Sequence, residues 1–193
     1  MHNYCKLKIL LGSMFSGKST ELIRLIRREQ SINNNILVIK PIIDNRYSNE
    51  HICSHNNDRI RCITTNNLNE IIQLEEWDKI NCIFIDEGQF FKGLYNFVIE
   101  CLETYNKSVI IAGLDGDSNR KSFGEILSLI PLADEVRKLS AYCHYCKNGT
   151  LGIFTHRITN DKKQTLIGGA NVYKAVCRQH YILLNKCSKT ITC

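Results

Sequence analysis

The sequence predicts an α/β fold, a P-loop parallel sheet with helices on both faces, followed by a small C-terminal zinc ribbon with a lasso loop. Short apolar runs alternate with helical segments through residue 140, which is typical of a parallel sheet covered on both sides. A glycine-rich motif joins the first run to the first helix, and two pairs of metal-binding residue types follow residue 140. We therefore expect a nucleotide-binding domain over residues 1–140, a zinc-binding unit over residues 141–184 and a tail over residues 185–193.

The order of apolar and polar segments predicts each element of the sheet. The runs at residues 36–40 and 82–86 are almost wholly apolar, as expected for strands buried on both faces. Further strands are expected at residues 6–11, 61–64, 109–113 and 136–139. Helices are expected from the glycine-rich motif to about residue 31, and at residues 68–74, 95–105 and 125–130. The polar stretch 44–58 is too long for a plain connector, so we expect it to be functional or mobile.

The glycine-rich motif at residues 12–19 fits the pattern G-x-x-x-x-G-K-[ST]. A strand that runs into such a turn and then a helix directs backbone N–H groups and the positive end of the helix dipole at one point, which favours phosphate. Lys18 would contact the terminal phosphates, and the Ser19 hydroxyl would bind the accompanying magnesium ion. An ordinary glycine-containing turn is the alternative. The expected ATP-binding residues are Gly12, Ser13, Met14, Phe15, Ser16, Gly17, Lys18, Ser19 and Thr20.

Two adjacent carboxylates close the apolar run at residues 82–86. Successive residues of a strand point to opposite sides, so Asp86 and Glu87 are expected to have different roles. We assign Asp86 to magnesium and Glu87 to the hydroxyl group that accepts the phosphate. The alternative is a pair of solvated acids in a turn.

The polar stretch after the second strand begins with Asp44 and Arg46. Asp44 could bond to a water molecule on the magnesium ion, and Arg46 could neutralise charge on the transferred phosphoryl group. The two side chains could instead pair with each other at the surface. In a later glycine-containing loop, Phe123 could either stack on a ligand or pack inward.

Two pairs of potential zinc ligands lie beyond residue 140, Cys143-x-x-Cys146 and Cys177-x-x-His180. Each pair has the spacing that a tetrahedral zinc ion requires, and four protein donors leave no open position, so the zinc is expected to be structural. The alternatives are two chance pairs or a disulfide, and His144 could compete with His180 as a ligand. The other cysteines are scattered mostly singly through apolar runs, so we interpret them as small buried hydrophobic residues in a reducing compartment.

The formal charge of +6 is mild. The basic residues Arg24, Arg27 and Arg28 lie opposite apolar residues in a helical pattern, so we interpret them as a solvated helix face rather than a nucleic-acid-binding patch. The sequence has no apolar run of about twenty residues and no secretion-signal pattern at its start. We therefore expect a soluble cytoplasmic protein with no membrane or nucleic-acid partner.

Taken together, the motifs resemble those of the zinc-containing thymidine kinases found in vertebrates, bacteria and large DNA viruses. They are G-x-M-F-S-G-K-S-T, D-x-R-Y, D-E-G-Q-F-F, L-D-G with R-K-x-F-G, and I-G-G-A-x-x-Y-x-x-V-C-R, within residues 7–181. The resemblance implies transfer of the terminal phosphate of ATP, with magnesium, to the 5′-hydroxyl of thymidine, and of deoxyuridine, in nucleotide salvage. It also implies a homotetramer and feedback binding of dTTP.

The resemblance further assigns residues to roles. Glu87 becomes the general base, and residues 12–20 become the triphosphate site. Lys18 and Arg46, assigned above from their positions in the sequence, are the other expected catalytic residues. The nucleoside site is expected to be formed by Met14, Phe90, Leu114, Ser118, Phe123, Thr155, Gln164, Thr165, Leu166, Ile167, Gly168 and Tyr173. The backbone of residues 164–168 would read the edge of the base. The chain departs from the family pattern at Ser13, where many members have proline, and at Ser118, where phenylalanine is usual. The alternative from another class is a P-loop ATPase whose zinc ribbon binds nucleic acid.

Overall fold

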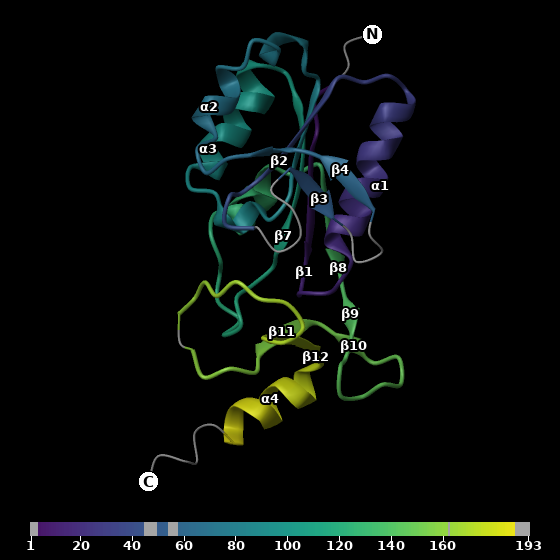
Figure 1. Ribbon diagram of the computed structural model, residues 1–193, viewed down its shortest axis with the longest axis vertical. Coiled ribbons are helices and arrows are strands. Elements are labelled where there is room, and N and C mark those ends of the chain that lie inside the picture. Colours follow the sequence, from purple (N-terminus) through teal and green to yellow (C-terminus); the bar gives the residue numbers. More distant parts are fainter. Residues whose placement is uncertain (1–3, 45–49, 54–57, 162, 188–193) are drawn as a thin grey trace.

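The structure is a computed structural model that describes residues 4–44, 50–53, 58–161 and 163–187 of the chain. Within these residues, six parallel strands form one sheet in the order β5-β2-β6-β7-β1-β8. The strands are β1 (Leu7–Gly12), β2 (Ile36–Lys40), β5 (Ile63–Thr64), β6 (Cys82–Ile85), β7 (Ser108–Leu114) and β8 (Glu135–Leu139). This arrangement confirms the predicted α/β fold class, and Figure 1 shows helices on both sides of the sheet.

The helices of the sheet domain are mostly short. They are α1 (Lys18–Ser31), α2 (Asn69–Ile72) and α3 (Leu94–Ile99). Single 3₁₀ segments occur at η1 (Trp77–Lys79), η2 (Gly88–Phe90) and η4 (Ile126–Leu132), and α3 continues into a π-helical turn, η3 (Glu100–Thr104).

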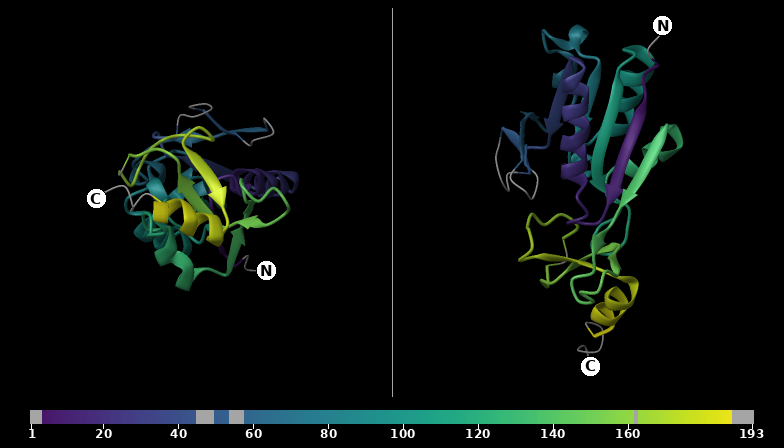
Figure 2. Two further views of the ribbon diagram at one scale, coloured as in Figure 1. Left: turned by 90° about the horizontal axis from the view of Figure 1, so that it is seen from below. Right: turned by 90° about the vertical axis from the view of Figure 1, so that its right-hand side faces the viewer.

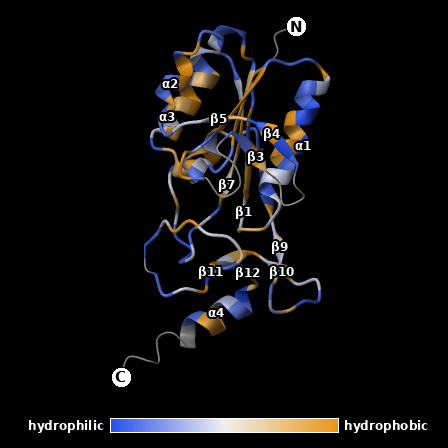
Figure 3. Ribbon diagram, in the orientation of Figure 1, coloured by the Kyte–Doolittle hydropathy of each residue, from blue (hydrophilic) through white to orange (hydrophobic). Residues whose placement is uncertain are grey.

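Alternate residues of each strand pack into two separate cores. Phe84 on β6 lies in the core cluster beneath α1, whereas its neighbours Ile83 and Ile85 lie in the cluster that α2 and α3 cover. Both faces of β6 are therefore buried, as its uninterrupted apolar sequence predicts. Figure 3 shows the apolar residues gathered in the strands between the helical layers. Burial also raises the pKa of the thiols of Cys82 and Cys101 to about 12, which agrees with their interpretation as apolar core residues.

The segment at residues 68–74 is less helical than predicted. Only Asn69–Ile72 is α-helical. The following backbone hydrogen bonds join residues three apart, as in turns: Gln73 N–H donates to Glu70 O, and Leu74 N–H donates to Ile71 O. The helix predicted at residues 95–105 is present as α3 followed by the π-helical turn η3, which ends at Thr104; Asn106, two residues later, has a left-handed backbone with φ 50°.

The strand predicted at residues 61–64 is divided between two strands, the end of β4 (Arg59–Arg61) and β5. β4 forms an antiparallel hairpin with β3 (His51–Cys53), so part of the long polar stretch is regular structure. The Cys62 N–H still donates to Glu50 O of this hairpin (2.9 Å), and from Ile63 onward β5 pairs with β2 in the main sheet. The chain therefore changes sheets at Cys62.

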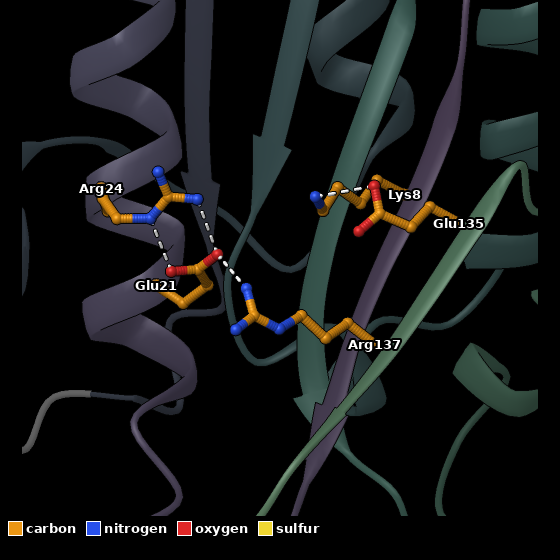
Figure 4. A network of polar contacts seen from close by, with 5 residues as sticks. All are labelled: Lys8, Glu21, Arg24, Glu135 and Arg137. Atoms are coloured by element: carbon orange, nitrogen blue, oxygen red, sulfur yellow. Dashed lines mark hydrogen bonds and ion pairs between the residues drawn. The ribbon is translucent and has the colours of Figure 1, made fainter.

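Charged side chains connect α1 to the edge of the sheet (Figure 4). The Glu21 carboxylate accepts hydrogen bonds from Arg24 on the same helix (2.7 and 2.9 Å) and from Arg137 on β8 (2.7 Å). The bond from Arg24, together with the charges of Arg24, Arg137 and Lys8, lowers the pKa of Glu21 against the opposing effect of burial. Beside it, Lys8 and Glu135 form an ion pair (2.8 Å) between β1 and β8. The Arg24 side chain is exposed and bonds to an acid on its own helix, as expected for a residue on a solvated helix face.

The residues after 140 form a smaller unit at the end of the sheet where β1 and β7 end (Figure 2). It contains the antiparallel pairs β9 (Ala141–Tyr142) with β10 (Leu151–Gly152) and β11 (Phe154–Arg157) with β12 (Tyr173–Val176), followed by α4 (Arg178–Cys187). Its own small core includes Val176 and Tyr181. Among the described residues, no helix combines the length and the apolar character needed to span a membrane.

Candidate active site

A cavity of about 540 Å³ lies between the glycine-rich loop, the carboxyl ends of β6 and β7, and the loop that joins β11 to β12. This volume suits a small-molecule ligand. The predicted site residues that line it are Met14, Phe15, Ser16, Gly17, Lys18, Ser19, Thr20, Asp44, Asp86, Glu87, Phe90, Leu114, Ser118, Phe123, Thr155, Gln164, Thr165, Leu166, Ile167, Gly168 and Tyr173. Gly12 and Ser13 lie just outside this lining, and Arg46 lies outside the described residues.

The glycine-rich loop has the backbone that its sequence predicts. A Cβ atom on Gly12 would lie 2.3 Å from the carbonyl oxygen of Leu139, so β1 can pass β8 here only without a side chain. Gly17 has φ 82° and begins α1, a conformation that glycine adopts without strain. The N-terminal N–H groups of α1 therefore face the cavity, as a phosphate site requires.

Two side chains of this loop are prepared for an anion. The Lys18 ammonium is buried and donates to the Ser13 carbonyl (2.8 Å). The Ser16 hydroxyl oxygen is buried and, within the described residues, has no hydrogen-bond partner. An unpaired buried hydroxyl is costly unless a ligand completes it. Both groups fit a bound phosphate chain.

Oxygen donors suited to magnesium gather beside the loop. The Ser19 hydroxyl donates to one carboxylate oxygen of Asp86 (3.1 Å), and the other oxygen of Asp86 accepts the Glu87 N–H (3.0 Å). Asp44 is also buried at the cavity, which argues against its pairing at the surface. Burial, and then the charges of Glu87 and Asp44, raise the pKa of Asp86 to about 7. A divalent cation would relieve this crowding of carboxylates, and oxygen ligands are those it prefers.

Glu87 is set apart from Asp86 by a turn rather than by strand alternation. β6 ends at Ile85, and Glu87 has φ 51° in the left-handed region, a strain that is often found at functional sites. Gln89 holds the Glu87 carboxylate, because its side-chain N–H donates to it (2.6 Å) while its carbonyl oxygen accepts the Leu114 N–H (3.0 Å). The different positions of the two acids are as predicted, but the strand-based reason was wrong.

Aromatic and apolar side chains form the opposite part of the cavity. The rings of Phe90 and Phe123 pack edge to face, with centroids 5.3 Å apart. Phe123 is buried and also lines the cavity, so it packs inward and remains available to a ligand. Leu114 and Tyr173 complete this wall. Such a surface suits a flat, partly apolar ring.

Hydrogen bonds join the glycine-rich loop to the small unit. The Ser13 hydroxyl donates to the Gly152 carbonyl (2.9 Å), and the Met14 N–H donates to the Thr155 hydroxyl (3.0 Å). Many zinc-containing thymidine kinases have proline at the position of Ser13. In this chain the Ser13 hydroxyl at that position forms a hydrogen bond to the small unit. Thr155 also lines the cavity.

The loop after β7 is attached to the small unit as well. The Tyr181 hydroxyl donates to the carbonyl of Ser118 (2.8 Å), and the Arg120 guanidinium lies 4.4 Å from the centre of the Tyr181 ring. The Gln164 side-chain N–H donates to the carboxylate of Asp117 (3.0 Å). Ser118 therefore borders the cavity without the aromatic ring of the family pattern, and its backbone fixes this loop in place.

Three cysteines and a histidine of the small unit converge on one point. The ligand atoms of Cys143, Cys146, Cys177 and His180 all lie within 4.8 Å of one another. The Nδ1 atom of His180 is 3.3–3.6 Å from the three sulfurs, and Cys146 and Cys177 are 3.8 Å apart. A tetrahedral zinc ion, with Zn–S of about 2.3 Å and Zn–N of about 2.0 Å, would separate its ligands by about 3.8 and 3.5 Å. The donor set and its geometry fit such an ion.

The remaining features of this cluster agree with a closed metal site. Burial raises the pKa of Cys143, but hydrogen bonds from three backbone N–H groups outweigh it and lower that pKa to about 6, which favours the thiolate that binds metal. His144 is not in the cluster; its N–H donates to Ala175 O (2.9 Å) and its ring packs against Tyr145. Of the two histidines weighed from the sequence, His180 is the one placed for a metal.

Seven further residues line the cavity that were not predicted to do so. They are Lys40, His51, Cys53, Gln89, Asp117, Arg157 and Gly169. Two of them could have been predicted from the sequence. Lys40 is a charged residue at the end of an apolar strand, and Gln89 lies in the same motif as Asp86 and Glu87. The Lys40 ammonium is buried and donates to the carbonyls of Asp44 (3.0 Å) and His51 (3.1 Å). Asp117 and Arg157 had no local signal.

Comparison with known proteins gives a consistent result. The family model for thymidine kinase matches residues 5–181. A thymidine kinase of sheeppox virus is 42% identical over 184 residues, which cover 94% of this chain and 99% of the viral protein. The human protein named cytosolic thymidine kinase is 42% identical over 176 residues, covering 91% of this chain and 73% of the human protein. A rice thymidine kinase is 40% identical over 92% of this chain and 66% of its own length.

Proposed function

The chain belongs to the thymidine kinase family, and on that premise we propose that it transfers the terminal phosphate of ATP to the 5′-hydroxyl of thymidine. The observation that carries this proposal is that the expected phosphate loop, Glu87 and an aromatic wall line the same cavity. ATP and a nucleoside can meet there at the Glu87 carboxylate. The products are thymidine 5′-monophosphate and ADP.

The phosphate loop and its neighbours supply the charge that phosphoryl transfer requires. Lys18 would exchange its bond to the Ser13 carbonyl for the terminal phosphates. Ser19 and Asp86 would hold magnesium, with Asp44 acting through water. Magnesium bound with ATP neutralises charge on the phosphates. We also propose that Arg46 contributes positive charge to the transferred group, as its position in the polar stretch after the second strand led us to expect.

Glu87 would act as the general base. Its carboxylate accepts a bond from Gln89, which is buried and tied to the backbone of β7. This contact fixes the orientation of the carboxylate, so that one oxygen can accept the proton of the 5′-hydroxyl as the new bond forms. Because phosphoryl transfer depends mainly on position and charge, the proton need not leave before the phosphate arrives.

The nucleoside base would lie between the aromatic wall and the backbone of residues 164–168. Phe90, Phe123 and Tyr173 provide apolar surface, and backbone N–H and C=O groups would read the edge of the pyrimidine. Apolar contact with the thymine methyl group is worth about 1–3 kcal/mol, so deoxyuridine should be a weaker substrate. A base with the wrong hydrogen-bonding pattern leaves buried groups unpaired and is rejected more strongly.

Phosphate transfer from labelled ATP to thymidine, deoxyuridine and deoxycytidine tests the proposal. We expect kcat/KM to be highest for thymidine, reduced by about 10- to 200-fold for deoxyuridine, and negligible for deoxycytidine. Efficient transfer to deoxycytidine, or none to thymidine, would contradict it. A parallel titration with DNA and RNA examines the ATPase alternative, which requires hydrolysis that nucleic acid stimulates and binding that weakens steeply with salt.

Further properties are proposed with the activity. We propose one structural zinc ion at the Cys143, Cys146, Cys177 and His180 cluster, and a cytoplasmic location. Residues 141–184 would be a zinc-binding unit separate from the sheet domain. dTTP, which joins the same nucleoside to a triphosphate, would bind in the same cavity as a feedback ligand. We also propose a homotetramer; β8 ends the described strand order with residues 135–138 exposed, and light scattering would measure the assembly.

A further inference from the structure

Arg157 lies at the end of β11, at the start of the loop whose backbone is proposed to read the nucleoside base. We call the described residues 158–161 and 163–172 the lasso loop. Arg157 is cross-strand from Tyr173, where the lasso loop returns to β12. Its side chain therefore starts at the base of the loop and can reach across it.

The Arg157 guanidinium is bonded mainly to the backbone of the lasso loop. Its N–H groups donate to the carbonyl oxygens of Asp161 (2.9 Å), Lys163 and Gln164 (3.0 Å). It also donates to the Tyr173 hydroxyl (2.9 Å) and lies 5.3 Å from the centre of that ring. One side chain thus provides hydrogen-bond donors for three backbone carbonyls, which would otherwise each need a separate donor.

Tyr173 extends this network further along the loop. Its hydroxyl accepts the bond from Arg157 and donates to the carbonyl of Leu166 (2.7 Å). The two side chains together hold carbonyls at residues 161, 163, 164 and 166. These contacts include part of the 164–168 backbone that faces the cavity.

The same strand also contacts the phosphate loop. Thr155 is two residues before Arg157 on β11, and residues i and i+2 of a strand share one face. The Thr155 hydroxyl accepts the Met14 N–H (3.0 Å). β11 therefore places the lasso loop and the phosphate loop relative to each other, with Thr155 at one contact and Arg157 at the other.

We propose that Arg157 is a positioning residue that sets nucleoside affinity and base discrimination by fixing the lasso-loop backbone. The inference rests on the proposed function, because Arg157 is said to hold the backbone that would contact the nucleoside base. Arginine is required because its planar guanidinium offers several donors in fixed directions, whereas a lysine ammonium would reach fewer of these carbonyls. The residue acts on the base site and not on the transferred phosphate.

Steady-state kinetics of Arg157→Lys test the proposal, with Arg178→Ala as the matched control. Arg178 is also in the small unit and packs over an aromatic ring, that of Phe154 at 4.9 Å. We expect Arg157→Lys to raise KM for thymidine by about tenfold or more, as the loss of two or three net hydrogen bonds implies. KM for ATP and kcat should change by less than about threefold, and deoxycytidine should be excluded less strongly. Arg178→Ala should resemble the wild type.

A protease readout tests the same contact without catalysis. Lysyl endopeptidase cleavage after Lys163, followed by mass spectrometry on the ligand-free protein, should be faster in Arg157→Ala than in the wild type and in Arg178→Ala. If the Arg157 variants do not fold, Tyr173→Phe removes the second half of the network. It should shift KM for thymidine in the same direction.

The outcomes separate this inference from the proposed function. A wild-type protein that does not phosphorylate thymidine contradicts the function, whatever the variants do. An active wild type whose Arg157→Lys variant keeps its KM for thymidine, its discrimination against deoxycytidine and its rate of cleavage overturns the role of Arg157. A variant that loses only kcat, with KM unchanged, indicates less active protein and equally overturns it.

Discussion

At the scale of single residues, two neighbouring acids acquire different chemistry from their surroundings. Asp86 is buried among other carboxylates and the Ser19 hydroxyl, whereas Glu87 is turned away by its left-handed backbone and held by Gln89. Both residues border one cavity, so the proposed magnesium ligand and the proposed general base could serve the same reaction. Replacing each acid by its amide should therefore have different consequences.

Glu87→Gln should lower kcat for thymidine by about a hundredfold or more, because general-base catalysis contributes about 10²–10⁴. Nucleoside affinity should change little, since the amide keeps the size of the side chain. Single-turnover kinetics and nucleoside binding by calorimetry measure the two quantities. A variant that retains near-normal turnover would remove Glu87 from the role of base. Gln89→Leu should show a smaller loss, because it leaves the Glu87 carboxylate in place but removes its donor and the acceptor of the Leu114 N–H.

Asp86→Asn should make the protein more stable without magnesium and nucleotide, and the gain should grow with pH. The folded protein raises the pKa of Asp86 from 3.8 to about 7. Between these values the unfolded chain is ionised while the folded carboxyl keeps its proton, so this acid destabilises the fold progressively and most fully above pH 7. We expect a gain on the order of a few kcal/mol at pH 8 that shrinks toward pH 5. Urea unfolding at both pH values measures it; a gain independent of pH would contradict this account.

At the scale of elements, the sheet gains its stability from burial on both faces rather than from its surface charges. Phe84 is fully buried between β6 and α1, while Arg137 remains half exposed although it bonds to Glu21. Full burial of an apolar side chain stabilises the fold by about 1.5–3 kcal/mol, whereas an exposed ion pair contributes about 0–1 kcal/mol. The network in Figure 4 therefore aligns α1 with β8 without being a main source of stability.

Phe84→Ala and Arg137→Ala test this ranking directly. Phe84→Ala should reduce the free energy of unfolding by about 3–5 kcal/mol, through lost burial and the cavity left behind. Arg137→Ala should reduce it by about 1 kcal/mol or less. Both values come from chemical denaturation at neutral pH and moderate salt. Comparable losses in the two variants would show that the charged network carries more of the stability than its exposure allows.

At the scale of the whole molecule, the site exists only where the sheet domain and the small unit meet. The phosphate loop and Glu87 belong to the first, and the lasso loop belongs to the second. Hydrogen bonds from Ser13 to Gly152 and from Tyr181 to Ser118 join them. The proposed zinc ion at Cys143, Cys146, Cys177 and His180 would hold β12 and α4 against the β9–β10 pair, so its loss should disturb the nucleoside site.

Removing the metal with a chelator should abolish thymidine binding while most of the sheet stays folded. The proposed zinc ion joins two chain segments that are about thirty residues apart, and a structural zinc contributes directly to folding. Circular dichroism, metal analysis and nucleoside calorimetry would follow the change. Cys177→Ser should lose the metal, whereas Cys62→Ser, outside the cluster, should keep it. Full thymidine affinity in the metal-free protein would contradict this coupling.

The sequence by itself determined the parts of this protein that depend on local rules. Apolar runs predicted the parallel strands within a residue or two, the glycine spacing predicted the turn between β1 and α1, and the cysteine and histidine spacing predicted which four side chains converge. Each of these follows from backbone geometry or ligand spacing within a short segment. Helix ends and the β3–β4 hairpin were less predictable, because turns and pairing partners there depend on contacts elsewhere in the chain.

Only the tertiary structure decided which residues complete the cavity. Asp117, Gln89 and Arg157 lie in segments that are far apart in the sequence, and each becomes part of the site through a contact with another segment. No periodicity or spacing encodes such a contact, because it depends on how the sheet domain and the small unit pack together. The sequence determined which reactive and ligand residues the chain contains. The packing of the sheet domain against the small unit determined which other side chains hold those residues in position.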